Sequence, residues 1–249
     1  MEGPAAESAR LAALLPDVPR FVETRGMLLG ENCEVFGFEG DVASPSFVVR
    51  DREEDLVCVV GYPARESIAE AVTRSGDASA VIAMPENVSR TTQALPGREP
   101  RPATLHLLGE AEWLPGAAEG HVRLLAGPEE LRLLPPGLRA ELRAELKRAL
   151  RRGAATVAAF VGGVPVSFCY VASETEGLWD VSIDTLEEHR RQDHAAQCAA
   201  SLIRHMRHTA RKEPVWGAVE SNAASMDLAA KLGFVPVDRI FVFEPDRSQ

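Results

Sequence analysis

The sequence is poor in the residues that would indicate disulfide bonds, a metal centre or a membrane segment. It has 4 cysteines in 249 residues, and they are scattered without the spacing of a metal-ligand set. We therefore expect Cys33, Cys58, Cys169 and Cys198 to be buried free thiols in a reducing compartment, and we expect no metal. No stretch approaches the roughly 18 apolar residues of a membrane-spanning helix, and the first residues lack the basic and apolar segments of a signal peptide. These features predict a cytoplasmic protein without a membrane partner.

The sequence also lacks an excess of basic residues. The formal net charge is −10, and it is unevenly placed. Residues 1–125 hold 11 basic and 20 acidic side chains, a net −9, whereas residues 126–249 hold 16 and 17, a net −1. Binding to phosphate backbones needs concentrated Lys and Arg, so nucleic acid is not an expected partner. An acidic N-terminal half suits a cationic, amine-bearing substrate, although a solvated acidic surface is the simpler alternative.

Hydrophobic periodicity predicts an α/β protein in two parts. Prolines and glycines between Pro102 and Pro128 punctuate the chain, and we place a domain boundary near residue 125. The first domain, residues 1–125, is expected to be a smaller α/β domain. Its predicted elements are helices at 5–15, 64–74 and 86–95 and strands at 34–38, 47–50, 56–60, 80–83 and 103–108.

The second domain, residues 126–249, is expected to have a mixed central sheet flanked by helices. The Gly162-Gly163 pair predicts a hairpin between strands 155–160 and 164–171. The other predicted elements are a helix ending at Arg152, a strand at 178–185, a helix at 195–211, a strand near Trp216, a helix at 223–232 and a strand at 237–243.

The segment between strand 178–185 and the following helix has the composition of an anion site. It contains two adjacent arginines in a polar turn, within residues 189–195 (HRRQDHA). A strand that ends in such a turn aims the unpaired amides of the next helix at whatever lies above the strand. Together with the helix dipole, this geometry suits a pyrophosphate.

This segment resembles the acyl-CoA pyrophosphate loop of the GNAT-type N-acetyltransferases. The family pattern is Arg or Gln, two residues, Gly, one residue, then Gly or Ala; Arg190 fills the first position and Ala195 the last. At the right distance follows a stretch similar to the second family motif, a strand, an Asn and a short helix ending in Lys-Leu-Gly-Phe. Here it runs from Trp216 through Asn222 to Phe234. The resemblance covers the C-terminal half, and the N-terminal half is at most a degenerate copy of it, without a residue-level repeat.

The resemblance implies acetyl-CoA as cosubstrate and assigns residues to it. The pantetheine arm is expected beside the strand at Ile183, Asp184 and Thr185, and the pyrophosphate over the loop that follows. Asn222 matches a family position that contacts the cofactor, although its alternative role is to cap the next helix. The expected cofactor-binding residues of the loop are Arg190, Arg191, Gln192, Asp193, His194, Ala195 and Ala196.

Two positions depart from the family pattern. Asp193 stands where the family has glycine, so it must accept a left-handed backbone and place a carboxylate beside a pyrophosphate. Its side chain either weakens binding, faces solvent or caps the helix that follows. The tyrosine that protonates the leaving thiolate in many family members is missing, since Ala229 holds its position, and Ser225 or water would have to replace it.

The function that follows is direct transfer of an acetyl group from acetyl-CoA to a primary amine of a small molecule or peptide, in a ternary complex. A base must keep the amine neutral, and Glu220 is the first candidate, with Asp180 and Asp184 as alternatives on one face of the strand. The N-terminal half is expected to shape the acceptor site or an oligomer interface, such as that of a homodimer. The opposing hypothesis is a GNAT fold that has lost catalysis and serves as an acyl-CoA-binding or regulatory module.

Overall fold

A computed structural model describes residues 4–30, 32–39, 44–76, 79–109, 114–116, 121–135 and 137–245. The chain forms two compact units, each built from more than one segment. The first contains residues 1–106, 217–226 and 236–249, and the second contains residues 107–216 and 227–235. The predicted boundary near residue 125 stays a prediction; in this division the change of unit comes after His106, and the first unit also takes up two C-terminal segments.

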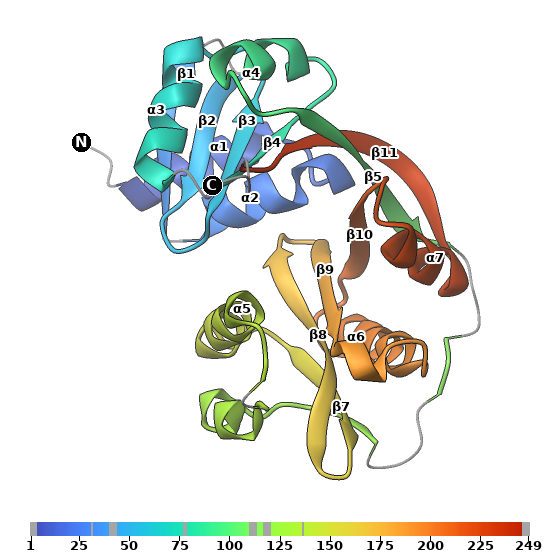
Figure 1. Cartoon of the computed structure of the whole chain (residues 1–249). Helices are drawn as coiled ribbons and strands as arrows, with labels where there is room; N and C mark the ends of the chain where they lie inside the picture. The colour runs from blue at the N-terminus through green and yellow to red at the C-terminus, as the bar shows by residue number, and fades with distance from the viewer. Residues whose placement is uncertain are drawn as a thin grey trace. The chain divides into compact units, whose positions relative to one another are not determined.

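The first unit is a sheet covered by helices on both faces. Helices α3 and α4 pack on one face and α2 on the other (Figure 1). Its strands follow the order β1-β2-β3-β4-β11-β5, with β3 and β4 parallel and β11 antiparallel to β4. The elements are α1 (Pro4–Leu14), η1 (Pro19–Phe21), α2 (Val22–Leu29), β1 (Cys33–Glu39), β2 (Ser46–Asp51), β3 (Leu56–Val60), α3 (Arg65–Ser75), β4 (Ala80–Ala83), α4 (Val88–Ala94) and β5 (Pro100–Leu108).

The core of this unit is built around two strands, β3 and β4, whose sequences are continuously apolar. Residues of β3 and β4 are buried on both faces, as expected for strands between two helical layers. On the α3 face, Ile68 and Val72 pack against Val48, Val59 and Phe243. The predicted buried strands at 56–60 and 80–83 are therefore confirmed.

The second unit contains the hairpin and the long helix predicted for the C-terminal half. Its strands follow the order β10-β9-β8-β7-β6; β9 is parallel to β10 and antiparallel to β8. The elements from residue 122 onward are β6 (Val122–Leu124), η2 (Pro128–Leu133), α5 (Ala140–Arg151), β7 (Thr156–Val161), β8 (Val164–Glu174), β9 (Leu178–Thr185), η3 (Glu187–His189), α6 (His194–Thr209), β10 (Glu213–Val219), α7 (Ala223–Lys231) and β11 (Phe234–Phe243). By the division above, β10, α7 and β11 each begin in one unit and end in the other.

Alternating side chains of β7 and β8 pack against two helices, one on each face of the sheet. Ala158, Phe168 and Tyr170 pack with the apolar side of α5, which includes Leu142 and Leu146. Helix α6 packs against β7, β8 and β9 and buries its own small and apolar residues (Figure 1). The period of two in the strands therefore places one helix against each face. The expected mixed sheet flanked by helices is confirmed.

The two halves of the chain share one order of elements. In each, three successive antiparallel strands are followed by a helix, a strand parallel to the third, another helix and a further strand: β1-β2-β3-α3-β4-α4-β5 and β7-β8-β9-α6-β10-α7-β11. The N-terminal half thus repeats the topology of the C-terminal half without repeating its motif residues.

The four cysteines are free thiols. Cys58, Cys169 and Cys198 are buried, as predicted, while Cys33 is partly exposed. Burial raises the pKa of the Cys58, Cys169 and Cys198 thiols, which disfavours the reactive thiolate form at neutral pH. None of the described helices is both long and apolar enough to cross a bilayer.

Candidate functional site

Strand β9 has one edge that is only partly paired. Along β8 its register runs from Glu174↔Trp179 to Ser167↔Thr185. Along β10 it has three register pairs, which end at Val215↔Asp180. Within the fully described stretch 137–245, residues 181–185 have no register partner on β10. The backbone of Ile183, Asp184 and Thr185 therefore lies on a strand edge that a ligand can use, as an added strand would.

The turn after β9 leads into α6 through two left-handed residues. The Leu186 amide donates to the Val166 carbonyl at 2.9 Å, which ends the pairing with β8. Arg191 and Asp193 then have φ angles of 58° and 64°, in the region that favours glycine. The need for a left-handed residue at position 193 is confirmed, and Asp is one of the residue types that tolerate it.

Helix α6 starts with amides that have no partner inside the helix. Its hydrogen bonding begins when the Gln197 amide donates to the Asp193 carbonyl at 3.0 Å. The amides of His194, Ala195 and Ala196 precede that bond, and such groups point out of the first turn of a helix. With the positive end of the dipole, they form a surface that suits an anion.

Two arginines supply positive charge at this turn. Arg190 and Arg191 are both exposed. The Arg190 Nε donates to the Thr185 carbonyl at 3.2 Å, so this side chain folds back over the end of β9. Gln192 uses its side-chain amide to donate to the Glu188 carbonyl at 3.3 Å. Neither arginine forms a salt bridge within the part of the chain that the structure describes.

The carboxylate of Asp193 is directed to a lysine. Its Oδ1 lies 2.6 Å from the Nζ of Lys231, the last residue of α7. Asp193 occupies the N-cap position of α6 but makes no capping hydrogen bond. The alternative in which its side chain caps the helix is therefore wrong. The physical reason is the left-handed backbone, since a capping residue normally has an extended conformation that turns its oxygen toward the first amides.

His194 contributes to the site through its backbone. Its side chain is buried, and Nδ1 lies 3.1 Å from Nε2 of His121. Burial lowers the pKa of His194, and the nearby His121 and His189 rings lower it further. The Nε2 atom has no hydrogen-bond partner among the described residues. The buried imidazole leaves only the amide of this residue at the helix surface.

The acidic residues of β9 are also engaged. The Asp184 carboxylate forms an ion pair with Arg139, which precedes α5. Thr185 shares a hydrogen bond of 2.7 Å with the Ser167 hydroxyl on β8. Asp180 is half-buried on the same strand. These contacts fix the side chains on either side of the open backbone edge.

The remaining predicted residues precede or begin α7 and belong to the first unit. Glu220 forms an ion pair with Arg239, with Oε1 2.9 Å from Nε, and it accepts a hydrogen bond of 3.3 Å from Thr104. Asn222 accepts the Ser225 amide on its Oδ1 at 3.2 Å, so its capping role is confirmed. Glu220, Asn222 and Ser225 are thus close to one another, while Asp180 and residues 183–196 lie together in the second unit. That both groups serve one reaction stays a prediction.

Three basic residues at these positions were not assigned from the sequence. They are Arg139, Lys231 and Arg239. Each pairs with an acidic residue at least 19 positions away, and no sequence pattern links such partners. Among the described residues, no group of three or more His, Cys, Asp or Glu side chains is placed to hold a metal ion.

Comparison with known families agrees with this geometry. Residues 150–242, from the end of α5 to β11, match the model of the family described as GNAT acetyltransferase. Most of the C-terminal half therefore matches a GNAT family model. The matched span includes the β9 edge, the turn, α6 and α7, so the resemblance predicted from the two sequence motifs is confirmed.

The likeness of the fold to solved GNAT structures extends over the whole chain. A GCN5-related N-acetyltransferase-like protein from Streptococcus suis is 17% identical with a TM-score of 0.65, over 97% of this chain and 100% of that one. A GCN5-related N-acetyltransferase from Kribbella flavida is 14% identical with a TM-score of 0.61, over 96% and 95%.

A tandem GNAT protein from the clavulanic acid biosynthesis pathway is 15% identical with a TM-score of 0.54, over 98% and 94% of the two chains. At such identities these likenesses show the fold alone. No curated protein matches the chain.

Proposed function

We propose that the chain transfers an acetyl group from acetyl-CoA to a primary amine, by direct attack in a ternary complex. The observation that carries the proposal is the β9 edge, which is unpaired with β10 beyond Asp180 and leads into the free amides of α6. An extended amide-bearing arm that ends in a pyrophosphate matches both features. The family match and the GNAT fold support the same cosubstrate.

The residues present fit acetyl-CoA. The backbone of residues 183–185 would bind the pantetheine arm, and the amides of His194, Ala195 and Ala196 would bind the pyrophosphate. Arg190 and Arg191 are exposed and free of salt bridges to described residues, so they can add positive charge. Acetyl-CoA supplies an activated acetyl thioester.

The rest of the chemistry falls to proton transfers. The amine must lose a proton as its nitrogen bonds to the carbonyl carbon, and the thiolate released when the C–S bond breaks must gain one. Glu220 is proposed as the base, and Ser225 or water as the donor to the thiolate, because Ala229 occupies the place of the family tyrosine. The ion pair with Arg239 restrains the Glu220 carboxylate, so we propose that an incoming amine displaces Arg239 from it.

The acceptor is proposed to be a cationic small molecule or peptide that carries a primary amine. The net charge of −9 over residues 1–125 supports this class, because an acidic surface raises the local concentration of cations.

A second function follows from Asp193 and Ala229. Both depart from the family pattern, and together they motivate an acyl-CoA-binding protein without turnover. The two functions differ in whether an amine consumes the thioester.

Turnover is measured as the release of free CoA thiol when acetyl-CoA is mixed with a panel of primary amines. We expect release that depends on the amine, and a fall in kcat of about 10²-fold or more for Glu220→Gln with little change in KM for acetyl-CoA. Binding of acetyl-CoA without release for any amine would select the second function. An unchanged kcat in Glu220→Gln would remove Glu220 from the base role while leaving the transferase.

A further inference from the structure

The glycine position of the pyrophosphate turn is held by an acidic residue with an unusual environment. Asp193 has φ 64° and ψ 4°, and it is the last residue before α6. Its carboxylate is two-thirds exposed and makes no bond to the first-turn amides. Those amides are therefore left for a ligand. An unneutralised carboxylate at this position would nevertheless repel the pyrophosphate that the proposed function places there.

Lys231 neutralises that carboxylate, and its backbone is anchored to do so. It is the last residue of α7, where the helix dipole favours a cation. The next residue, Leu232, is 2% exposed, and Gly233 ends the helix with φ 87°. Phe234 is buried and its ring lies 5.3 Å from that of Trp216. The core on the C-terminal side of Lys231 thus determines where its side chain begins.

The two residues come from different elements of the second unit, 38 positions apart. An exposed ion pair of this kind contributes little to the stability of the fold. Its effect on the local charge is larger: with Lys231 in place, the carboxylate of Asp193 is paired on the side of α7 rather than free at the start of α6.

From this geometry we propose that Lys231 is a positioning residue for the acyl-CoA site: it holds and neutralises Asp193, and thereby makes an aspartate workable at a position where the family has glycine. The inference rests on the proposed function, because it concerns the same pyrophosphate. Lys231 acts through Asp193, and its importance therefore depends on whether Asp193 is present. Asp193 and Lys231 together therefore take the place of the single glycine of the family pattern.

A double-mutant cycle with free CoA as the titrant tests this dependence. The variants are Lys231→Met, Asp193→Gly and the two combined, measured by calorimetry at low salt, with Lys231→Arg as the conservative variant. We expect Lys231→Met to weaken CoA binding about tenfold, equivalent to about 1.4 kcal/mol. Asp193→Gly and the double variant should bind within about threefold of the unmodified chain, and Lys231→Arg should retain affinity.

Titration with 3′-dephospho-CoA separates the pyrophosphate from the 3′-phosphate. The loss in Lys231→Met should be equal for both titrants, because the pyrophosphate is common to them. The thermal midpoints of the variants without ligand should stay close together, since the pair is exposed.

Several outcomes would overturn the inference. If Lys231→Met binds CoA as well as the unmodified chain, Asp193 needs no neutralisation. If it weakens binding equally in the Asp193→Gly background, or only for CoA with its 3′-phosphate, Lys231 contacts the ligand directly and is not a positioning residue. Failure of the unmodified chain to bind CoA would instead overturn the proposed function, and this inference with it.

Discussion

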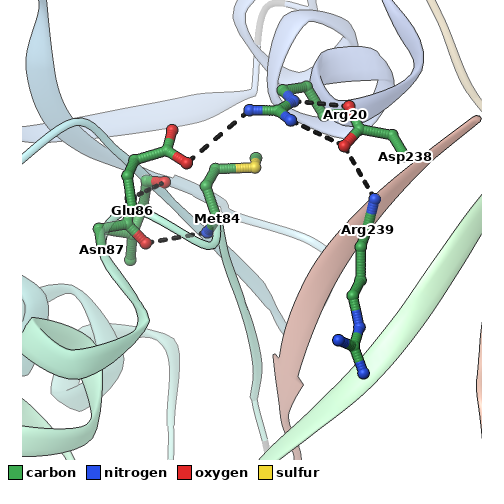
Figure 2. A network of polar contacts seen from close by, with 7 residues as sticks. Arg20, Met84, Glu86, Asn87, Asp238 and Arg239 are labelled. Carbon is green, nitrogen blue, oxygen red and sulfur yellow. Dashed lines mark hydrogen bonds and ion pairs between the residues drawn. The ribbon is translucent and has the colours of Figure 1, made fainter.

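Each unit contains a pair of parallel strands, β3 and β4 in the first and β9 and β10 in the second. The strand order around the two pairs is the same, but the structure beyond the last paired residues differs. In the first unit, β3 and β4 share three register pairs, which end at Cys58↔Ile82. Immediately beyond them, the fully buried Asn87 donates from Nδ2 to the Val59 carbonyl at 3.1 Å and accepts the Met84 amide at 2.9 Å. Figure 2 shows the Asn87 side chain facing Met84. In the second unit, β9 and β10 also share three register pairs, but residues 181–185 of β9 have no register partner on β10.

The turns that follow β3 and β9 also differ: other residues of the chain pack against the first, whereas the second is exposed. Gly61 after β3 has φ 60°, and a Cβ there would lie 2.4 Å from the Pro45 carbonyl and 2.6 Å from the Ser46 Oγ. The chain itself therefore fills the space above that turn. After β9, the turn instead presents exposed arginines. The same topology thus leaves the end of β3 covered by groups of the chain, which we call the closed half, and the end of β9 uncovered, which we call the open half. The side chain of Asn87 and the residues around Gly61 make this difference.

The largest expected effect comes from opening the closed half. Asn87→Leu would leave the Val59 carbonyl and the Met84 amide buried without partners. Each such group costs about 1–3 kcal/mol, so we expect a loss of about 3 kcal/mol in the free energy of unfolding, measured by urea denaturation.

The matched control is Asn222→Leu, which removes the cap of α7 on an exposed residue and should cost about 1 kcal/mol. Equal losses in the two variants would mean that Asn87 does not close β3 and β4 in the way described.

A smaller difference in stability is expected between an ion pair of the first unit and one of the second. Arg20 holds Asp238 through two hydrogen bonds of 2.7 Å in the first unit, with Glu86 on its other side (Figure 2). The hydrogen bond from Arg20 is the main cause that lowers the pKa of Asp238. The folded pKa lies below the unfolded value of about 3.9, so the pair stabilises the fold above that pH and the contribution is lost as the pH falls through the folded pKa.

We expect Asp238→Asn to lower stability by about 1 kcal/mol at pH 7 and to reduce the loss of stability between about pH 5 and pH 2. Asp193→Asn, in the exposed pair with Lys231, is the control and should lower stability at pH 7 by less than Asp238→Asn does. Urea midpoints measured across this pH range check both. A change of the same size in the two variants would remove the distinction between a partly buried and an exposed pair.

Much of the fold could be predicted from apolar periodicity and turn residues, with clear exceptions. Helix α2 was missed because Gly26 interrupts it and because Thr24 and Arg25 are buried in it; the Arg25 guanidinium donates to the carbonyls of Ala12 and Leu15. Strand β6 has three residues, too few to show alternation. Strand β11 begins at Phe234 rather than near residue 237, since it follows directly on the glycine that ends α7.

The candidate site could be predicted only as far as its local segments. The motif residues lie within one strand, one turn and the first turn of one helix, so sequence spacing finds them. Long-range partners such as Lys231 for Asp193 or Arg239 for Glu220 are set by tertiary packing. The closing role of Asn87 depends on a contact to a strand 28 residues away, which no local pattern announces.

The most direct test of the account is calorimetric titration of the whole chain with acetyl-CoA, using one substitution placed at the same helix position in each half. Ala195→Pro removes an amide from the second residue of α6, and Glu66→Pro removes one from the second residue of α3; proline is tolerated in the first turn of a helix. We expect one site per chain, about tenfold weaker binding for Ala195→Pro, and no change for Glu66→Pro. Absence of binding up to about millimolar acetyl-CoA, two sites per chain, or equal effects of the two prolines would contradict it.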